Sequence, residues 1–387
     1  MKDENLNLIE KTYRQLISEG KEIRKLFSGN PNEQGIRFPS GPLKKSYENY
    51  FNHQDYRPDP KGLLVARETI QKYYAKNGAS LQKENILLTS GTSESFFYLF
   101  SLLAKPGDNI LTPNPSYPLF DHIAKLAGVE LRQYSLDEEK NWSIDMQDLQ
   151  GKTDHRTRGI VLISPHNPTG AVLRREELLA ITEWANKNEI PLICDEVFSE
   201  FYFEKGKFPR AMVESSPRLC FTLNGISKMF ALPALKLGWI AVTGEESRVR
   251  PMVDHLETTA DTFLSVHIPV QETLPSLFRE GESFLQEYHA EVHRRRERAI
   301  GTLRRFSTIR FVEPAGGFYL MAKIQKSVGL TEEEFVIRLM KEKKVFVHPG
   351  YFYDYEKGIH FVISFLTKEE ELEEGLQAVG DFISRLG

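Results

Sequence analysis

Short apolar runs alternate with amphipathic segments through most of the chain, and this alternation constrains the fold more than any other feature. Each apolar run is short enough for a buried strand, and the runs are residues 86–88, 109–111, 160–163, 191–194, 219–221 and 238–242. Apolar residues recur at helical spacing in 96–103, 119–126 and 176–188. Strands that alternate with helices form a mostly parallel sheet covered by helices on both faces. The sequence therefore predicts an α/β fold.

The pattern changes after about residue 245. A long charged segment, 280–305, predicts one helix, and strands are expected at 309–312, 317–322, 345–347 and 360–365. Thr331 followed by Glu334 has the pattern of a capping box, so a further helix is expected to begin there, and a last helix is expected over 367–387. We therefore predict three parts, which are an N-terminal segment (1–44) that packs with the small domain and the active site, a large domain (45–275) and a small α+β domain (276–387).

Composition excludes several classes of protein. The 387 residues include 50 Lys and Arg against 54 Asp and Glu, which argues against a nucleic-acid partner bound through a basic surface. An apolar run long enough to span a membrane is missing, and the polar N-terminus does not resemble a secretory signal. Two cysteines, Cys194 and Cys220, are too few for a disulfide framework or a zinc site. We expect a cytoplasmic protein with no bound metal, no nucleic-acid partner and no membrane partner.

Two charged residues follow predicted strands. Lys228 comes after the run at 219–221 and has apolar neighbours, and a desolvated lysine has a lowered pKa and can act as a nucleophile. Asp195 follows the run at 191–194, at the edge where open parallel sheets bind ligands. An isolated aspartate in that place is also typical of a helix N-cap.

Two loops follow other strands. Asn167 lies in a proline-rich loop after 160–163, where its amide can donate and accept hydrogen bonds, although a simple turn has the same pattern. Small residues at 90–93 follow the strand at 86–88 and precede a helix, and such a loop can bind a phosphate through backbone N–H groups and hydroxyls. Each of these signals is common when it occurs alone.

Together the four signals supply what pyridoxal 5'-phosphate requires, namely an anion site, a contact for its phenolic oxygen, a carboxylate for its ring nitrogen and a lysine for its aldehyde. Along nearly its whole length the chain resembles the fold type I, class I/II pyridoxal-phosphate-dependent aminotransferases of the aspartate aminotransferase superfamily. The motifs that carry the resemblance are YRPDPKG at 56–62, PSYP at 115–118, NPTG at 167–170, DEV at 195–197, SK at 227–228 and LKLGW at 235–239.

The resemblance implies a role for each motif. Lys228 is implied to form a Schiff base with the cofactor and to move the substrate's Cα proton. Asp195 is implied to keep the ring nitrogen protonated, and Asn167 to bind the phenolic oxygen. The other implied cofactor contacts are Tyr117 on the ring face, Gly91, Thr92, Ser93, Ser227 and Lys236 at the phosphate, and Tyr56 at the phosphate of a neighbouring subunit. The resemblance therefore implies a homodimer with shared active sites.

The sequence departs from the family pattern at three positions. Lys236 stands where members usually have an arginine that binds the phosphate. The planar guanidinium group, which can donate two parallel hydrogen bonds, is therefore replaced by a single ammonium group. Phe198 stands where many members have a tyrosine that binds the phenolic oxygen. Val362 stands where most members have the arginine that binds the substrate α-carboxylate. Arg37 and His348 are the candidates to bind the substrate in its place.

The resemblance implies transamination, in which an amino group moves between an amino acid or other amine and a 2-oxo acid. Because Val362 replaces the carboxylate-binding arginine, a lyase, decarboxylase or racemase on the same scaffold stays open as an alternative. A cofactor-binding regulator of related fold is disfavoured, since the chain has no helix-turn-helix pattern and no excess of basic residues.

Overall fold

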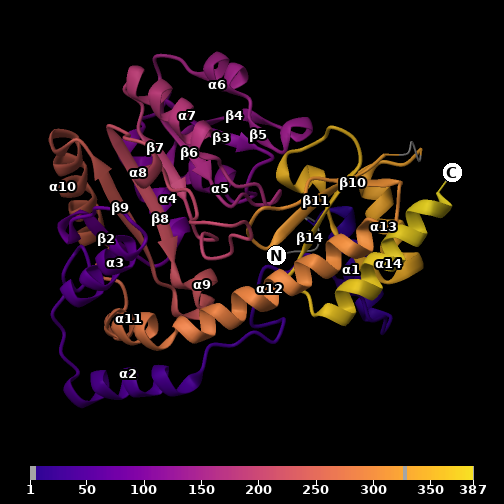
Figure 1. Ribbon diagram of the computed structural model, residues 1–387, viewed down its shortest axis with the longest axis horizontal. Coiled ribbons are helices and arrows are strands. Elements are labelled where there is room, and N and C mark those ends of the chain that lie inside the picture. Colours follow the sequence, from indigo (N-terminus) through magenta and orange to yellow (C-terminus); the bar gives the residue numbers. More distant parts are fainter. Residues whose placement is uncertain (1–5, 326–328, 387) are drawn as a thin grey trace.

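The computed structural model describes residues 6–325 and 329–386, and its central element is an eight-stranded sheet with the order β2-β9-β8-β7-β6-β3-β4-β5 (Figure 1). The strands are β2 (Ile86–Thr89), β3 (Asn109–Asn114), β4 (Glu130–Asp137), β5 (Ser143–Ile144), β6 (Thr157–Ile163), β7 (Leu192–Asp195), β8 (Leu219–Gly225) and β9 (Gly238–Gly244). Strands β4, β3, β6, β7 and β8 pair in parallel, and β9 lies antiparallel between β8 and β2. Every strand of this sheet except β5 and β9 therefore runs in the same direction.

Apolar side chains alternate between the two faces of this sheet and form two core clusters. In β2, Leu87 packs into one cluster, while Ile86 and Leu88 pack into the other. Buried residues of α4 (Thr92–Leu103), α5 (Phe120–Ala127) and α10 (Glu246–Phe263) belong to the cluster of Leu87. The opposite cluster includes residues of α3 (Leu64–Lys76), α7 (Arg175–Lys187), α8 (Ala211–Glu214) and α11 (Ile268–Glu280). The α/β fold expected from the alternation is thus confirmed.

A second, four-stranded antiparallel sheet has the order β10-β11-β14-β13. Its strands are β10 (Ile309–Phe311), β11 (Tyr319–Ile324), β13 (His348–Pro349) and β14 (His360–Ser364). The long helix α12 (Glu282–Leu303) runs from the large sheet to this one, and α14 (Glu369–Arg385) packs against it (Figure 1). Helix α13 (Glu332–Lys343) begins with the capping box expected at Thr331 and Glu334.

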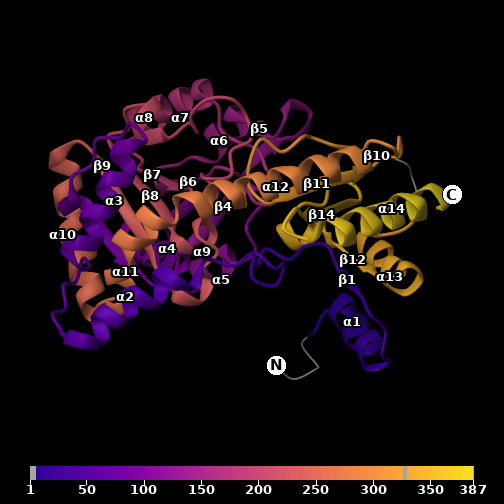
Figure 2. The ribbon, with the colours of Figure 1, turned by 60° about the horizontal axis from the view of Figure 1, so that its bottom comes forward.

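The N-terminal segment packs against this second sheet. Helix α1 (Leu8–Ser18) contacts α13, and β1 (Arg24–Lys25) pairs in parallel with β12 (Val345–Phe346), as Figure 2 shows. The chain then returns to the large sheet, where α2 (Ser40–His53) packs against α11. Residues 26–39 therefore lie between the two sheets and close to both.

Shorter elements complete the described chain, and they are α6 (Met146–Lys152), α9 (Ile226–Met229), and the 3-10 helices η2 (Lys83–Asn85), η3 (Glu138–Lys140), η4 (Pro233–Leu235) and η5 (Gly350–Tyr353). Among the described helices none is both long and apolar enough to cross a membrane.

Candidate active site

The loops that carry the predicted motifs meet at one edge of the large sheet. Strands β2, β6, β7 and β8 run in the same direction, so the loops after them all emerge at that edge. They surround a cavity of about 140 Å³. The predicted residues that line it are Gly91, Thr92, Tyr117, Asn167, Asp195, Ser227 and Lys228. The structure therefore brings the four sequence signals to one place.

Lys228 lies in the short helix α9, directly after β8. Its Nζ donates a hydrogen bond to the carbonyl oxygen of Gly29 at 2.8 Å. Burial lowers the pKa of Lys228 to about 8, because desolvation disfavours the charged amine, and the nearby Asp195 partly offsets this effect. A larger share of this amine is therefore neutral and nucleophilic at neutral pH than for a surface lysine.

Asp195 is the last residue of β7 and is buried. Its Oδ1 accepts a hydrogen bond from the backbone N–H of Val197 at 3.1 Å. Burial raises the pKa of Asp195 to about 7, and the neighbouring Glu196 raises it further, while Val197 and Lys228 act in the opposite direction. A buried carboxyl group in this state is suited to pair with a cationic group of a bound molecule.

Asn167 and Tyr117 both line this cavity. The Oδ1 of Asn167 is buried and has no hydrogen-bond partner among the described residues. Buried polar atoms are usually paired, so this oxygen is available to a hydrogen-bond donor. Burial raises the pKa of Tyr117, and its ring packs edge-on against Phe120 at 5.5 Å between centroids. Tyr117 is therefore neutral and offers an apolar surface to the cavity.

The anion end of the cavity lies at the N-terminus of α4. Gly91 is the N-cap of this helix, and its φ of 119° is a conformation that favours glycine. A Cβ placed on Gly91 would lie 3.6 Å from the Nζ of Lys236, so this amine is close to the helix N-terminus. Backbone N–H groups and a nearby cation together favour a phosphate. Ser93, which the resemblance places in the same cradle, is exposed and is not part of the cavity wall.

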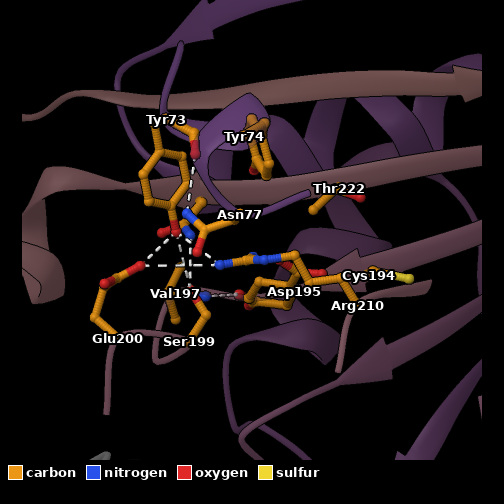
Figure 3. A network of polar contacts seen from close by, with 12 residues as sticks. Tyr73, Tyr74, Asn77, Cys194, Asp195, Val197, Ser199, Glu200, Arg210 and Thr222 are labelled. Carbon is orange, nitrogen blue, oxygen red and sulfur yellow. Dashed lines mark hydrogen bonds and ion pairs between the residues drawn. The ribbon is translucent and has the colours of Figure 1, made fainter. Parts of the chain in front are cut away.

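Next to Asp195 lies a buried polar network that no sequence motif predicted (Figure 3). Glu196 and Arg210 are each 2% exposed and form an ion pair. The Nη2 of Arg210 also donates to the hydroxyl of Tyr73 at 2.8 Å, and that hydroxyl donates to Glu200. Burial raises the pKa of Glu196, whereas Arg210 lowers it. The ion pair with Arg210 therefore favours the charged form of this carboxyl group, which lies beside the end of β7 that carries Asp195.

A second cavity of about 630 Å³ shares Tyr117, Asn167 and Tyr319 with the first. Its other walls come from the N-terminal segment and the small sheet, and they are Asn7, Phe27, Ser28, Gly29, Asn30, Pro118, His348, Phe352 and Tyr353. Gly29 fits closely here, since a Cβ on it would lie 1.9 Å from the Oη of Tyr319. Three residues of this wall, Tyr319, Phe27 and Tyr353, were not predicted from the sequence. For Tyr319 the alternation within the predicted strand 317–322 offered a signal, and for the other two we find none.

The substrate candidates have different outcomes. His348 lines the second cavity, stacks on Phe27 at 3.7 Å between centroids, and shares a hydrogen bond of 3.1 Å with the hydroxyl of Tyr353. Burial lowers the pKa of His348 to about 3, so the ring is neutral at pH 7. Arg37 is exposed and lines neither cavity. Tyr56 is 69% exposed and also lies outside both cavities, so within its own subunit it does not contact this site.

Comparison with known proteins points to one family. The sequence model of the family described as "Aminotransferase class I and II" matches residues 52–379. The chain is 28% identical over 382 residues to the glutamate-pyruvate aminotransferase AlaA of Haemophilus influenzae, which covers 97% of this chain and 94% of that protein. It is 27% identical to an alanine aminotransferase of Mycobacterium tuberculosis, with 95% and 87% of the two chains covered.

Solved structures agree with these matches. An alanine aminotransferase from Pyrococcus furiosus superposes with a TM-score of 0.90 and 26% identity, covering 97% of this chain and 96% of that one. An aminotransferase from Escherichia coli also has a TM-score of 0.90 at 26% identity, with 98% and 95% of the two chains covered. The similarity therefore extends over both sheets and the site between them.

Proposed function

The chain belongs to the aminotransferase class I and II family and is an aminotransferase, and we propose that it exchanges an amino group between an amine and a 2-oxo acid in the cavity around Lys228, with pyridoxal 5'-phosphate as cofactor. The observation that carries this proposal is the convergence of Lys228, Asp195 and Asn167 on one cavity at the N-terminus of α4. The lyase, decarboxylase or racemase alternative is not favoured, because the relatives described above are aminotransferases.

The residues of the cavity fit the proposed cofactor group by group. The N-terminus of α4, Ser227 and Lys236 would hold the phosphate. Asp195 would pair with the protonated ring nitrogen, and the side-chain N–H group of Asn167 would donate to the phenolic oxygen. Tyr117 would cover one face of the ring. When bound, the cofactor supplies an electron sink for the negative charge that forms on the substrate carbon.

The chain itself supplies the proton chemistry. The amine of Lys228 has a pKa of about 8 in the cofactor-free cavity, so it can both accept and release a proton near neutral pH. Its hydrogen bond to Gly29 O ties it to the N-terminal segment, between the two cavities. Phe198 and Tyr319 also line this cavity, with their ring centroids 6.0 Å apart.

The proposal includes a homodimer in which Tyr56 reaches the phosphate of the neighbouring subunit. One observation in support is that Tyr56 does not line the cavity of the chain that carries it. Another is that apolar side chains are exposed near Tyr56 in the sequence, as Phe51 is, and near α4, as Phe263 and Leu264 are. Mixed dimers of Lys228→Ala and Tyr56→Ala subunits test it. One intact site per mixed dimer should restore activity, and a mixture no more active than its parents would contradict shared sites.

A cytoplasmic location is also proposed, which suits the free buried thiols of Cys194 and Cys220.

A half-reaction tests the proposed function. The protein is loaded with the cofactor and mixed with a panel of amines and amino acids without any 2-oxo acid. We expect some donors to convert one equivalent of the cofactor to pyridoxamine phosphate and to yield one equivalent of the matching carbonyl product. Release of ammonia or carbon dioxide over many turnovers, with the cofactor unchanged, would contradict transamination.

A further inference from the structure

The wall of the substrate-side cavity is aromatic and carries no formal positive charge. Phe27, Tyr117, Tyr319, Phe352 and Tyr353 supply its rings. Its remaining polar groups are neutral amides, a serine, the imidazole of His348 and backbone groups. No arginine or lysine belongs to this wall among residues 6–325 and 329–386. The adjoining cavity, in contrast, is lined by a lysine, Lys228.

Val362 lies on the face of the small sheet that looks toward this cavity. It is the register partner of Met321 and His348, and Tyr319 pairs with Ser364 two residues further along the same strand. Because side chains alternate along a strand, Val362 shares a face with Tyr319 and His348. Val362 itself is fully buried. The structure therefore places an apolar side chain at this position, not a cation displaced by one residue.

The two other candidates do not restore a positive charge. The ring of His348 is sandwiched against Phe27 and bonded to Tyr353, and its low pKa leaves it neutral at pH 7. Arg37 follows buried Ile36 and precedes buried Phe38, so its own side chain faces solvent. A carboxylate brought to this aromatic wall would lose water without gaining a cation, which is unfavourable.

We infer that the specific substrate of this enzyme is a primary amine, or the matching aldehyde or ketone, whose reacting carbon carries no free carboxylate. The inference rests on the proposed function and deepens it by naming the substrate class. The aromatic rings of Phe27, Tyr319 and Phe352 then contact an apolar or aromatic substituent on that carbon. A 2-oxo acid used in the other half-reaction meets the same uncharged wall and is expected to bind weakly.

Matched substrate pairs test this inference on the intact, cofactor-loaded protein. The pairs are 2-phenylethylamine with phenylalanine, and isopropylamine with alanine, each compared at equal concentration of unprotonated amine. We expect the second-order rate constant of the half-reaction to be at least tenfold higher for the amine of each pair. A tenfold advantage for the amino acids would overturn the inference and leave transamination intact. If no member of any pair forms pyridoxamine phosphate, the proposed function fails and the inference fails with it.

A binding measurement removes any dependence on turnover. 3-Phenylpropionate and 3-phenylpropionamide have no amino group and differ only in the charge at the position under test. Calorimetry on the loaded protein should give a dissociation constant at least tenfold lower for the amide. Equal or tighter binding of the carboxylate would show that a cation from outside the described cavity wall reaches it, and would overturn the inference.

A charge added to the cavity wall should reverse the preference. His348→Arg places a cation on the wall, and His348→Gln is the matched neutral control. We expect His348→Arg to shift the ratio of phenylalanine to phenylethylamine reactivity toward the amino acid by at least tenfold, while His348→Gln leaves the ratio within about twofold. The same shift in both variants would contradict an effect of charge.

Discussion

The cofactor side of the site is polar and comes from one sheet edge, whereas the substrate side is aromatic and comes from distant segments of the chain. On the first side, Asp195 and Lys228 stand at the ends of neighbouring parallel strands, and a buried ion pair lies behind them. On the second side, Phe27 and His348 stack face to face, and they are brought together by the pairing of β1 with β12.

This difference indicates which substitutions change the reaction rate and which change the choice of substrate. On the cofactor side, burial shifts the pKa values of Lys228 and Asp195 toward neutrality, so the positions of charges determine what the site can do. On the substrate side, packing and the absence of charge determine which molecule fits. Substitutions on the two sides should therefore affect different quantities.

The largest effect is expected from Lys228→Ala. Without this amine the cavity has no group to link the cofactor or to move the substrate proton, and the rate of the half-reaction should fall by about 10⁴-fold. Stopped-flow absorbance with saturating amine measures it. Lys187→Ala removes an exposed lysine at the end of α7 that lines neither cavity; it is the control and should retain most of the rate. Comparable losses in both variants would contradict the special role of Lys228.

Arg210→Met should be the most destabilising of the substitutions considered on the cofactor side. It leaves Glu196 charged and buried without its partner, at a cost of about 3–5 kcal/mol in the free energy of unfolding. Urea denaturation measures this loss. The double variant with Glu196→Gln removes both charges and should recover most of it. A loss that the second substitution does not reduce would contradict the ion pair as its cause.

Asp195 should make the stability of the cofactor-free protein depend on pH. Its pKa is about 7 when folded, against about 3.9 for an unfolded aspartate, so protonation favours the folded state. This stabilisation is complete below pH 4 and is lost as the pH rises through 7, by up to about 4 kcal/mol. Asp195→Asn should remove this contribution, so the difference in unfolding free energy between the two proteins should change between pH 5 and pH 8. Parallel pH profiles for the two proteins would contradict the shifted pKa.

The smallest effect is expected on the substrate side. Phe27→Leu removes the ring that stacks on His348, a contact worth about 0.5–1.5 kcal/mol, so KM for an aromatic amine should rise by up to about tenfold. Cofactor affinity, measured by fluorescence titration, should stay within about twofold. Phe382→Leu changes a buried ring of the small-sheet core and controls for loss of packing alone. A change in cofactor affinity with unchanged KM would reverse the assignment of the two sides.

Much of the cofactor side could be predicted from the sequence because each of its parts is local. A polar residue directly after an apolar strand keeps its place at the sheet edge whatever the details of packing, as Asp195 and Asn167 do. Ser93, which the resemblance places at the phosphate, lies in the first turn of α4 with its side chain exposed, and its role stays a prediction. Strand β4 was not predicted from the sequence, because most of its residues are polar. It lies next to the edge strand β5.

The substrate side could not be predicted in the same way. Gly29 and Tyr319 approach each other only after β1 pairs with β12 and the small sheet forms, and no local pattern encodes that approach. Arg37 was expected at the substrate, but the burial of Ile36 and Phe38 on either side directs its side chain to solvent. The sequence did indicate the absence of a cation at Val362, and it named His348, which lines the second cavity.

The most direct test of the account is to locate the cofactor chemically. The loaded protein is reduced with borohydride, digested and analysed by mass spectrometry, with and without prior incubation with 2-phenylethylamine. We expect the cofactor's mass on the peptide that contains Lys228, and we expect the amine to remove that label because the amino group leaves on the cofactor. A label on another lysine, or a label at Lys228 that no amine removes, would contradict transamination in this cavity.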